Sequence, residues 1–319
     1  MYRVCAETEH LTAKGREMIR AACGECGCDL TFFHSAKDAD DRVRAGEILY
    51  CSSPALLPEM KALRWCHTAS AGVGTFVESG VFDSGEILLT NSSGAYGRAI
   101  SEHVVMVALM LLRNYMSYRK IIDSRQWQRH LPIRSIAGSR IAVVGTGDIG
   151  RSVAVRFRAL GAGSVIGFNR SGRAAEHFDR TFRMEAFTAQ IGDADIVVVC
   201  VPGTPETERL LSAERIAAIP ATAYLINVGR GSSIDQDALI RALNEGRIAG
   251  AALDVVVPEP LPPDHPLWNT RNLLLTPHCS GDYGLPYTSD RTVEIFCENL
   301  RRYVAGEELF NRIDSVKGY

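Results

Sequence analysis

The amino-acid sequence contains no hydrophobic segment long enough to cross a membrane. Its longest uninterrupted apolar run spans the nine residues 104–112, whereas a transmembrane helix needs about twenty such residues. The N-terminal residues also lack a basic stretch followed by an apolar one, which is the pattern of a secretory signal. We therefore predict a chain without a membrane span, located in the cytoplasm.

The sequence also lacks a large net charge of either sign. The 319 residues include 35 basic and 37 acidic side chains, which gives a net charge of −2. A chain without a basic surplus is not expected to bind nucleic acid or an acidic membrane surface. The 28 glycines and 13 prolines are too few for a disordered or fibrous protein, and the length predicts about two globular domains.

The spacing of the nine cysteines predicts neither a metal site nor a disulfide framework. Cys23, Cys26 and Cys28 could form half of a zinc or iron–sulfur site, but no second pair follows at ligand spacing. We interpret this segment as a helix that ends at a glycine and runs into a strand. Without an export signal, free thiols in a reducing compartment are the expected state.

Short apolar runs alternate with helical patterns along most of the chain, which is typical of parallel α/β folds. In the first part, the predicted strands are Tyr2–Ala6, Leu30–Phe33, Ile48–Cys51 and Arg64–Thr68, with a helix at Thr12–Ala22 and a linker from Leu88 onward. In the second part, the predicted strands are Ile141–Val144, Val165–Phe168, Ile196–Val201, Ala223–Val228, Ala249–Leu253 and Asn272–Leu275. The uniformly apolar composition of the second set indicates a parallel sheet buried on both faces.

Two long helices are predicted from the spacing of apolar residues. Tyr287–Ala305 has an apolar stripe along one face. Ile100–Met116 is apolar around its whole circumference, so we expect it to be buried against a domain or a second subunit.

A glycine fingerprint follows the first strand of the second part. Residues 145–150 read Gly-Thr-Gly-Asp-Ile-Gly and lie between a buried strand and a helical pattern at Arg151–Leu160. Glycine lets the backbone approach a pyrophosphate, and the N-terminus of the following helix offers N–H groups and a partial positive charge. This context predicts a dinucleotide site formed by Gly145, Gly147, Asp148, Ile149 and Gly150. We expect the Asp148 carboxylate to point away from the pyrophosphate and to serve the first turn of the helix.

The end of the second strand predicts which dinucleotide is bound. An NAD-selective site carries a carboxylate there for the ribose hydroxyl, but this sequence has Asn169, Arg170 and Ser171, with Arg173 beyond. A neutral amide, a guanidinium and a hydroxyl can bind the 2′-phosphate of NADP through charge-assisted hydrogen bonds. We therefore predict NADP rather than NAD.

Three later segments place polar residues directly after predicted strands, at the sheet edge where α/β proteins bind ligands. They carry Arg230, Glu259 and His278. Reduction of a 2-keto acid needs a cation that binds the carboxylate and a proton donor for the ketone oxygen. A guanidinium binds carboxylates through its planar fork, and imidazole changes its charge near neutral pH. We predict Arg230 as the substrate-binding cation, His278 as the general acid and base, and Glu259 as the carboxylate that orients the imidazole.

Together these motifs resemble the D-isomer-specific 2-hydroxyacid dehydrogenase family, from about Leu63 to the C-terminus. The resemblance is carried by Gly145–Gly150, Ala194-Asp195 through Pro202 and Thr207, Asn227–Gly231, Asp254 with Glu259-Pro260-Leu261-Pro262, and Thr276-Pro277-His278. The segment Asn169-Arg170-Ser171 is similar to the NADP-preferring, glyoxylate/hydroxypyruvate reductase-like members. Asp148, Cys200 and Gly74 depart from the residue types usual in the family.

The resemblance implies two α/β domains with a cleft between them. A Rossmann-type, doubly wound dinucleotide domain would span 98–281, and a smaller, flavodoxin-like substrate domain would combine 1–97 and 282–319. Backbone N–H groups of Ala71 and Gly72 would bind the substrate carboxylate together with Arg230 and His278. Further contacts to the cofactor are implied for Val201, Pro202, Thr207, Val228, Gly229, Asp254 and Ser280. Residues 100–139 resemble the family's dimerisation region, and the apolar circumference of the helix there needs cover, so we expect a C2 homodimer.

The sequence thus predicts an NADPH-dependent reductase that converts a small 2-keto acid to the D-2-hydroxy acid. The acids considered are glyoxylate, hydroxypyruvate and related pyruvate-like compounds. One alternative stays open: a dinucleotide-sensing interaction protein, like the corepressors related to this family, would keep the same residues with little turnover. Formate and phosphoglycerate dehydrogenases are nearer alternatives, although formate has no ketone for His278 to protonate.

Overall fold

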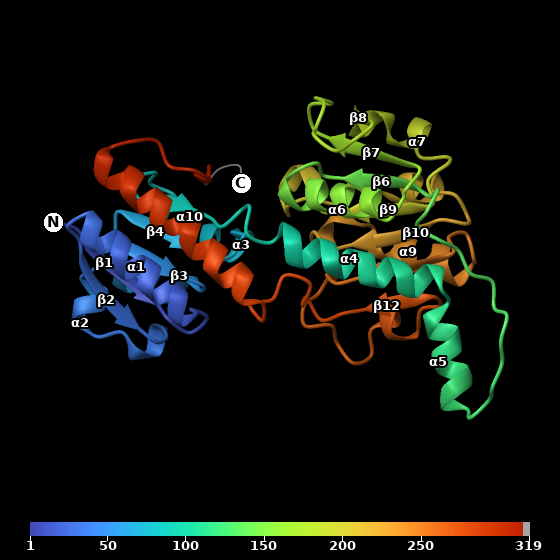
Figure 1. The fold of residues 1–319 in the computed structure, drawn as a ribbon, viewed down its shortest axis with the longest axis horizontal. Helices are drawn as coiled ribbons and strands as arrows, with labels where there is room; N and C mark the ends of the chain where they lie inside the picture. The colour runs from blue at the N-terminus through green and yellow to red at the C-terminus, as the bar shows by residue number, and fades with distance from the viewer. Residues whose placement is uncertain (315–319) are drawn as a thin grey trace. The chain divides into compact units, whose positions relative to one another are not determined.

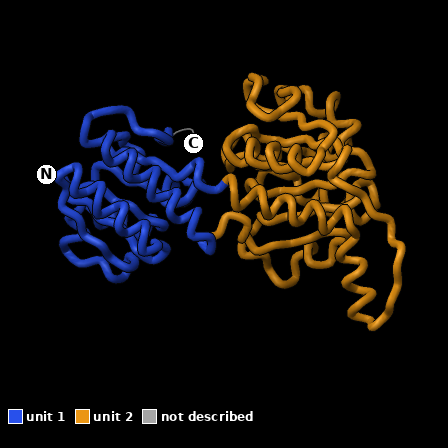
Figure 2. Tube along the Cα trace, viewed as in Figure 1, with its two compact units in different colours: residues 1–96, 283–319 blue, residues 97–282 orange. Residues whose placement is uncertain are grey.

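A computed structural model describes residues 1–314. The chain divides into two compact units: residues 1–96 with the segment from 283 onward, and residues 97–282 (Figure 2). Each unit is built on one parallel sheet, which confirms the predicted two-domain α/β fold. Within residues 1–314, no helix is both long and apolar enough to pass through a bilayer.

The smaller unit contains a five-stranded parallel sheet with the order β2-β1-β3-β4-β5, which is the strand order of flavodoxin-like folds. Its strands are β1 (Arg3–Glu7), β2 (Asp29–Phe33), β3 (Ile48–Cys51), β4 (Trp65–Thr68) and β5 (Leu88–Thr90). Its helices are α1 (Ala13–Glu25), α2 (Asp41–Arg44), α3 (Gly74–Val77) and α10 (Pro286–Ala305), with short 3₁₀ turns at Ala36–Asp38 and Pro54–Glu59. Helices α1 and α10 lie side by side (Figure 1).

Local sequence signals explain where these helices begin and end. The Thr12 hydroxyl caps α1 by accepting a hydrogen bond of 2.8 Å from the Gly15 N–H. Gly27 follows α1 with a φ of +64°, so the chain turns and enters β2 as expected for the cysteine-containing segment. Gly306 ends α10 in the same left-handed conformation.

The core of the smaller unit contains a continuous chain of neutral hydrogen bonds around His67. The indole N–H of Trp65 donates to the Thr90 hydroxyl over 2.8 Å, and Thr90 lies 2.7 Å from His67 Nδ1. On the other side, Nε2 lies 3.1 Å from the Ser92 hydroxyl, which donates to the Thr68 carbonyl. Because Thr90 and Ser92 each have one proton, Nδ1 accepts and Nε2 donates. The imidazole is therefore neutral and fully hydrogen-bonded.

The larger unit contains a seven-stranded parallel sheet with the order β12-β11-β10-β9-β6-β7-β8. Its strands are β6 (Arg140–Val144), β7 (Ser164–Asn169), β8 (Arg180–Arg183), β9 (Ile196–Val199), β10 (Tyr224–Asn227), β11 (Gly250–Leu253) and β12 (Leu273–Leu275). Its helices are α4 (Gly97–Leu112), α5 (Tyr115–Asp123), α6 (Asp148–Ala159), α7 (Phe187–Gln190), α8 (Ala213–Ala217) and α9 (Gln236–Asn244). Four short 3₁₀ turns occur at Met184–Ala186, Pro205–Thr207, Gly231–Ser233 and Pro266–Asn269.

The order of this sheet reverses between β6 and β9, since β6 pairs with β7 on one side and with β9 on the other. Dinucleotides bind at such a switch point, outside the carboxyl ends of the strands. The segments that follow β6 and β9 are the glycine fingerprint and the Cys200–Pro202 stretch.

Two predictions of local structure were wrong, and one strand was not predicted. Leu88–Thr90 is a short edge strand rather than the start of a linker. Arg180–Arg183 is also an edge strand, and it was not predicted because it contains no apolar run. The predicted single helix Ile100–Met116 is two helices, because Asn114 takes a left-handed φ of 53° between α4 and α5. In the single chain, Met106 and Leu109 of helix α4 are 47% and 39% exposed.

Candidate active site

The predicted site residues of the larger unit gather at the carboxyl edge of its sheet. Gly145 follows β6, Val201 lies two residues beyond β9, and Arg230 lies just beyond β10. Asp254 follows β11 directly, and His278 lies three residues beyond β12. Because all of these strands are parallel, their carboxyl ends meet at one edge.

The three fingerprint glycines meet different requirements. Gly145 has a φ of +102°, and a Cβ there would lie 2.9 Å from the Cys200 carbonyl oxygen. A Cβ on Gly150 would lie 2.0 Å from the Gly145 carbonyl oxygen, so close helix–strand packing demands glycine. A Cβ on Gly147 would meet no protein atom within 4 Å. Packing within the protein therefore does not explain the glycine at 147.

The start of α6 fits an anion. Gly147 is the N-cap residue and provides no side-chain cap, so the first N–H groups of the helix, including that of Ile149, have no intrahelical acceptor. The carboxylate of Asp148 is engaged elsewhere: its Oδ2 accepts a hydrogen bond of 3.0 Å from the N–H of Gly97, the first residue of α4. The Asp148 carboxylate thus serves the first turn of α4, and the prediction that it serves the first turn of its own helix was wrong.

The loop after β7 is organised by Asn169. Its side-chain NH₂ donates to the Thr146 hydroxyl over 2.9 Å, and its oxygen accepts from the N–H groups of Ser171 and Gly172. Arg170 and Ser171 are exposed on this loop. Asn169 therefore joins the loop after β7 to the glycine fingerprint, and Arg170 and Ser171 lie exposed on that loop.

The segment after β9 approaches the segment after β10 closely. A Cβ on Gly229 would lie 2.6 Å from the Val201 carbonyl oxygen, so Val201 and the adjoining Val228-Gly229 stretch are packed together. The Thr207 hydroxyl donates to the Pro202 carbonyl over 2.6 Å and fixes this loop. These predicted cofactor residues thus form one wall beside the fingerprint.

The Arg230 side chain packs against Gly203, and the next residue, Gly231, packs against the backbone of Val256. A Cβ on Gly203 would lie 3.0 Å from the Arg230 side chain, and one on Gly231 would lie 2.3 Å from the backbone of Val256. The guanidinium donates from Nη1 to the Gly229 carbonyl over 2.7 Å. Burial lowers the pKa of Arg230, and the charge of Glu259 opposes this effect. A cation with unused N–H donors is thus held at the sheet edge.

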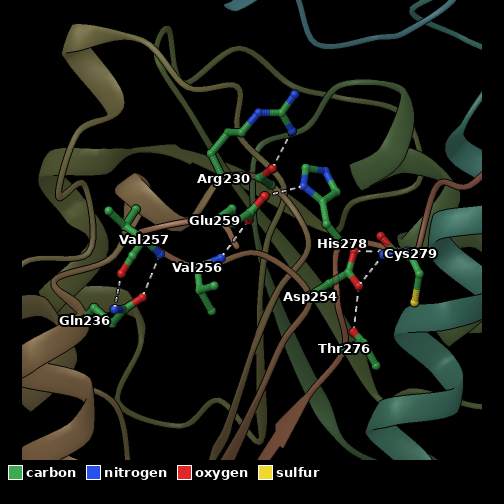
Figure 3. A network of polar contacts seen from close by, with 11 residues as sticks. Arg230, Gln236, Asp254, Val256, Val257, Glu259, Thr276, His278 and Cys279 are labelled. Carbon is green, nitrogen blue, oxygen red and sulfur yellow. Dashed lines mark hydrogen bonds and ion pairs between the residues drawn. The ribbon is translucent and has the colours of Figure 1, made fainter. Parts of the chain in front are cut away.

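Glu259 and His278 form a hydrogen-bonded pair beside Arg230 (Figure 3). Glu259 Oε2 lies 2.7 Å from His278 Nδ1, and Oε1 accepts from the Val256 N–H over 2.9 Å. A carboxylate only accepts, so the shared proton lies on Nδ1. The other ring nitrogen, Nε2, therefore remains for a ligand, and the imidazole is about half exposed.

Asp254 holds the loop that carries His278. Its side chain is buried, and it accepts hydrogen bonds from the Thr276 hydroxyl and from the backbone N–H groups of Cys279 and Ser280, over 2.6, 3.0 and 3.0 Å. Burial alone would raise the pKa of this carboxyl, but these hydrogen bonds outweigh burial and lower it. Asp254 is therefore an ionised anchor for the loop. Both the side chain and the backbone N–H of Ser280 lower the pKa of this carboxyl.

A second anchor, Gln236, was not predicted. It is the first residue of α9, and its side-chain amide binds both backbone groups of Val257, donating over 2.7 Å and accepting over 3.1 Å (Figure 3). Val257 lies two residues before Glu259, so this contact holds the loop that carries the carboxylate. The only sequence signal was the preceding Asp235, which caps α9.

Ala71 and Gly72 belong to the smaller unit, in the loop after β4. The Asn91 side chain donates to the Ala71 carbonyl over 2.7 Å, and the Ser70 hydroxyl donates to the Gly72 carbonyl over 2.6 Å. Within residues 1–314, the N–H groups of Ala71 and Gly72 donate to no protein acceptor. The loop therefore has its carbonyls fixed and two N–H groups available for an anion.

The sequence profile of the D-isomer specific 2-hydroxyacid dehydrogenase family, NAD binding domain, matches residues 105–280. The chain belongs to this family.

Relatives from several bacteria support the same placement. The chain is 27% identical over 285 residues to the glyoxylate/hydroxypyruvate reductase A of Serratia proteamaculans, covering 88% of this chain and 89% of the relative. A family member from Aeromonas salmonicida has a solved structure that is 32% identical, with a TM-score of 0.83 and coverage of 98% and 99%. Another, from Xanthobacter autotrophicus in complex with NADPH and MES, is 30% identical, with a TM-score of 0.83 and coverage of 100% and 99%.

The segment with Cys23, Cys26 and Cys28 connects α1 to β2. Among the side chains of residues 1–314, no group of three or more His, Cys, Asp or Glu residues is placed to hold a metal ion. Cys23 lies inside α1, Cys26 is its C-cap residue, and Cys28 immediately precedes β2. The segment connects a helix to a strand, as the sequence indicated.

Proposed function

We propose that this member of the family is an NADPH-dependent reductase that converts a small 2-keto acid, such as glyoxylate or hydroxypyruvate, to the D-2-hydroxy acid. The observation that carries the proposal is the Arg230, Glu259 and His278 constellation at the carboxyl edge of the larger sheet. The similarity to a glyoxylate/hydroxypyruvate reductase of Serratia proteamaculans supports the substrate class.

In this proposal the bound nicotinamide supplies the hydride. Residues of the protein bind the substrate carboxylate and supply the proton. Arg230 binds the carboxylate and polarises the ketone through its planar fork. His278 donates a proton from Nε2 to the ketone oxygen, and Glu259 stabilises the charged imidazole and keeps Nδ1 protonated. In the reverse direction, the same nitrogen accepts the proton.

The larger unit offers the groups that a dinucleotide requires. Gly145, Gly147 and Gly150 allow the backbone at the start of α6 to approach the pyrophosphate, and the free N–H groups there are donors. Arg170 and Ser171 would bind the 2′-phosphate of NADP, since neither repels an anion. Asn169, whose side-chain NH₂ donates to the Thr146 hydroxyl and the Arg173 carbonyl, would hold their loop. The NADPH complex of the Xanthobacter relative supports this choice. Val201, Pro202, Thr207, Val228, Gly229, Asp254 and Ser280 complete the proposed cofactor site.

The N–H groups of Ala71 and Gly72 are the proposed second grip on the substrate carboxylate. Their carbonyls are fixed by Asn91 and Ser70, so the two donors are held in place before a ligand arrives. We further propose that residues 1–97 with 282–319 bind the substrate and that residues 98–281 bind the cofactor.

We also propose a homodimer formed through residues 100–139. Large apolar side chains of this segment are exposed, namely Met106, Leu109, Tyr115, Met116, Ile122, Trp127 and Ile133. An apolar surface of this kind marks an interaction site on a folded chain. All nine cysteines are free thiols, which supports a reducing compartment and hence the cytoplasm.

A turnover assay tests the proposed function. Purified protein is mixed with NADPH or NADH and a panel of 2-keto acids, and oxidation of the cofactor is followed by absorbance. We expect turnover of glyoxylate or hydroxypyruvate, with higher kcat/KM for NADPH. Binding of NADPH without turnover of any keto acid would overturn the reductase and favour the dinucleotide-sensing alternative.

A further inference from the structure

The loop that carries His278 is also attached to helix α4, through a contact that the proposed mechanism does not use. His103 lies in α4, far away in the sequence, and its Nε2 is 3.3 Å from the hydroxyl oxygen of Thr276. Thr276 is the first residue after β12 and contacts Asp254 over 2.6 Å. Three side chains from separate segments thus form a hydrogen-bond chain, and its middle member, Thr276, lies two residues before His278.

The direction of each hydrogen bond in this chain follows from the groups involved. The Asp254 carboxylate only accepts, so the single hydroxyl proton of Thr276 points to Asp254 Oδ1. The Thr276 oxygen must then accept from His103, which places a proton on His103 Nε2. The chain runs from the His103 N–H to the Thr276 hydroxyl and on to the ionised Asp254.

Helix α4 is a firm support for His103. The neighbouring side chains of Val104 and Val107 are almost fully buried, and α4 packs against β10, β11 and α6. The imidazole itself is half-buried, and this burial lowers its pKa, an effect that the charge of Asp254 opposes. His103 is therefore a neutral donor on a rigid element.

Asp254 and Thr276, the acceptors in this hydrogen-bond chain, also hold the backbone of His278. His278 has a left-handed φ of 53°, which is unfavourable for a residue other than glycine. Its N–H donates to the carbonyl oxygens of Asp254 and Thr276 over 2.8 and 3.0 Å. The strained conformation is thus held by the same two residues to which His103 is linked.

We propose that His103 is a positioning residue: by donating to Thr276 it holds Thr276 and Asp254 in the arrangement that places His278 against Glu259. The inference rests on the proposed function where turnover is measured, because it deepens the account of the same site. Under this proposal, helix α4 both covers the sheet and holds the loop that carries His278.

The test compares His103→Leu, which removes the donor, with His103→Gln, whose amide N–H can replace Nε2–H. Thr276→Val and Thr276→Ser form the matching pair at the next position. We expect His103→Leu and Thr276→Val to lower kcat about tenfold. His103→Gln and Thr276→Ser should recover most of the loss. The double variant should be no worse than either single variant, since both break the same chain.

A second readout does not depend on turnover. Cys279 is exposed, and its N–H is bound by Asp254 in the same loop. Burial and the charge of Asp254 raise the pKa of its thiol, so a loop released from Asp254 should be alkylated by iodoacetamide several-fold faster. The rate is measured by mass spectrometry of the peptide that contains Cys279. Val107→Ala, in the same helix, should lower stability without changing this rate.

The outcomes separate the inference from the proposed function. A wild-type protein that reduces no keto acid defeats the reductase, but faster Cys279 alkylation in His103→Leu and Thr276→Val still supports the positioning role. Unchanged alkylation in both variants overturns it, as does a kcat loss that His103→Gln fails to restore. If His103→Leu does not fold, Thr276→Val and Thr276→Ser decide the question by the same two measurements.

Discussion

The imidazole of His278 and the carboxylate of Glu259 share a hydrogen bond of 2.7 Å between Nδ1 and Oε2. This contact assigns the two ring nitrogens different tasks, because the proton on Nδ1 is committed to Glu259. It also brings a negative charge next to a group that becomes positive when it takes up a proton. The pair is thus arranged to supply and recover a proton at Nε2.

Replacing His278 removes the proposed proton donor. We expect His278→Asn to lower kcat by roughly 10²–10⁴-fold and to leave the Kd for NADPH close to that of the wild type. Glu259→Gln should have a smaller effect, since the imidazole remains but loses its charged partner. Steady-state kinetics with glyoxylate, together with cofactor titration, checks both. Wild-type turnover in His278→Asn would eliminate the acid–base role.

Arg230 should affect both binding and chemistry. Arg230→Ala should raise the KM for the keto acid and lower kcat, with a combined loss in kcat/KM on the order of a thousandfold. Arg230→Lys keeps the charge but not the planar fork, so its kcat/KM should be intermediate. The same assay measures all three proteins. A KM unchanged in Arg230→Ala would show that another group binds the carboxylate.

The exposed Arg170 tests the cofactor preference. Arg170→Asp places a carboxylate where the 2′-phosphate is expected, so kcat/KM for NADPH should fall about a hundredfold and that for NADH should change little. Arg16→Asp, at an exposed position of α1, is the matched control. Equal use of NADPH and NADH by the wild-type protein would contradict the preference for NADP.

The buried His67 should make the protein sensitive to acid. Burial lowers the pKa of its imidazole from 6.5 to about 3. Between these values the unfolded state binds the proton and the folded state does not, so stability falls as the pH drops below about 6.5. At 1.36 kcal/mol per unit, the free energy of unfolding should be about 2 kcal/mol lower at about pH 5 than at neutral pH.

Urea unfolding at several pH values measures this effect. His67→Gln, which has no titrating group, is the control: it should lose stability at neutral pH but show a flatter pH dependence. An equally steep acid loss in His67→Gln would assign the effect to other groups.

The exposed apolar side chains within residues 100–139 predict a dimer. Trp127 is 87% exposed, and Ile122 on α5 is 50% exposed. Replacing them by Ser and Asp should convert a dimer to a monomer in light scattering, with the far-ultraviolet circular dichroism retained. A wild-type protein that is monomeric at micromolar concentration would remove the proposed interface.

Much of the fold could be predicted because its strands are buried on both faces. Ile48–Cys51 was predicted with the bounds it has, since four consecutive buried residues leave a continuous apolar run. Arg180–Arg183 was missed because an edge strand pairs on one side and tolerates arginine at both ends. The break at Asn114 depends on one left-handed residue, which an apolar periodicity does not indicate.

The candidate site likewise contains some residues that the sequence predicted and others that it did not. Arg230, Glu259 and His278 were found because their chemical types stand out after strands. His103 and Gln236 were not, because each acts through a backbone or a hydroxyl on another segment, and such contacts exist only once α4 and α9 are packed. The sequence spacing around His103 and Gln236 gives no indication of contact partners that lie so far away along the chain.

Among the fingerprint glycines, only at Gly147 would a Cβ meet no protein atom within 4 Å. A single methyl group at that position would therefore leave the folding of the domain intact and obstruct the approach of a phosphate. Gly147→Ala offers a separation-of-function tool: a cofactor-blind form of the protein, suited to asking in a living cell which effects of this chain depend on its dinucleotide.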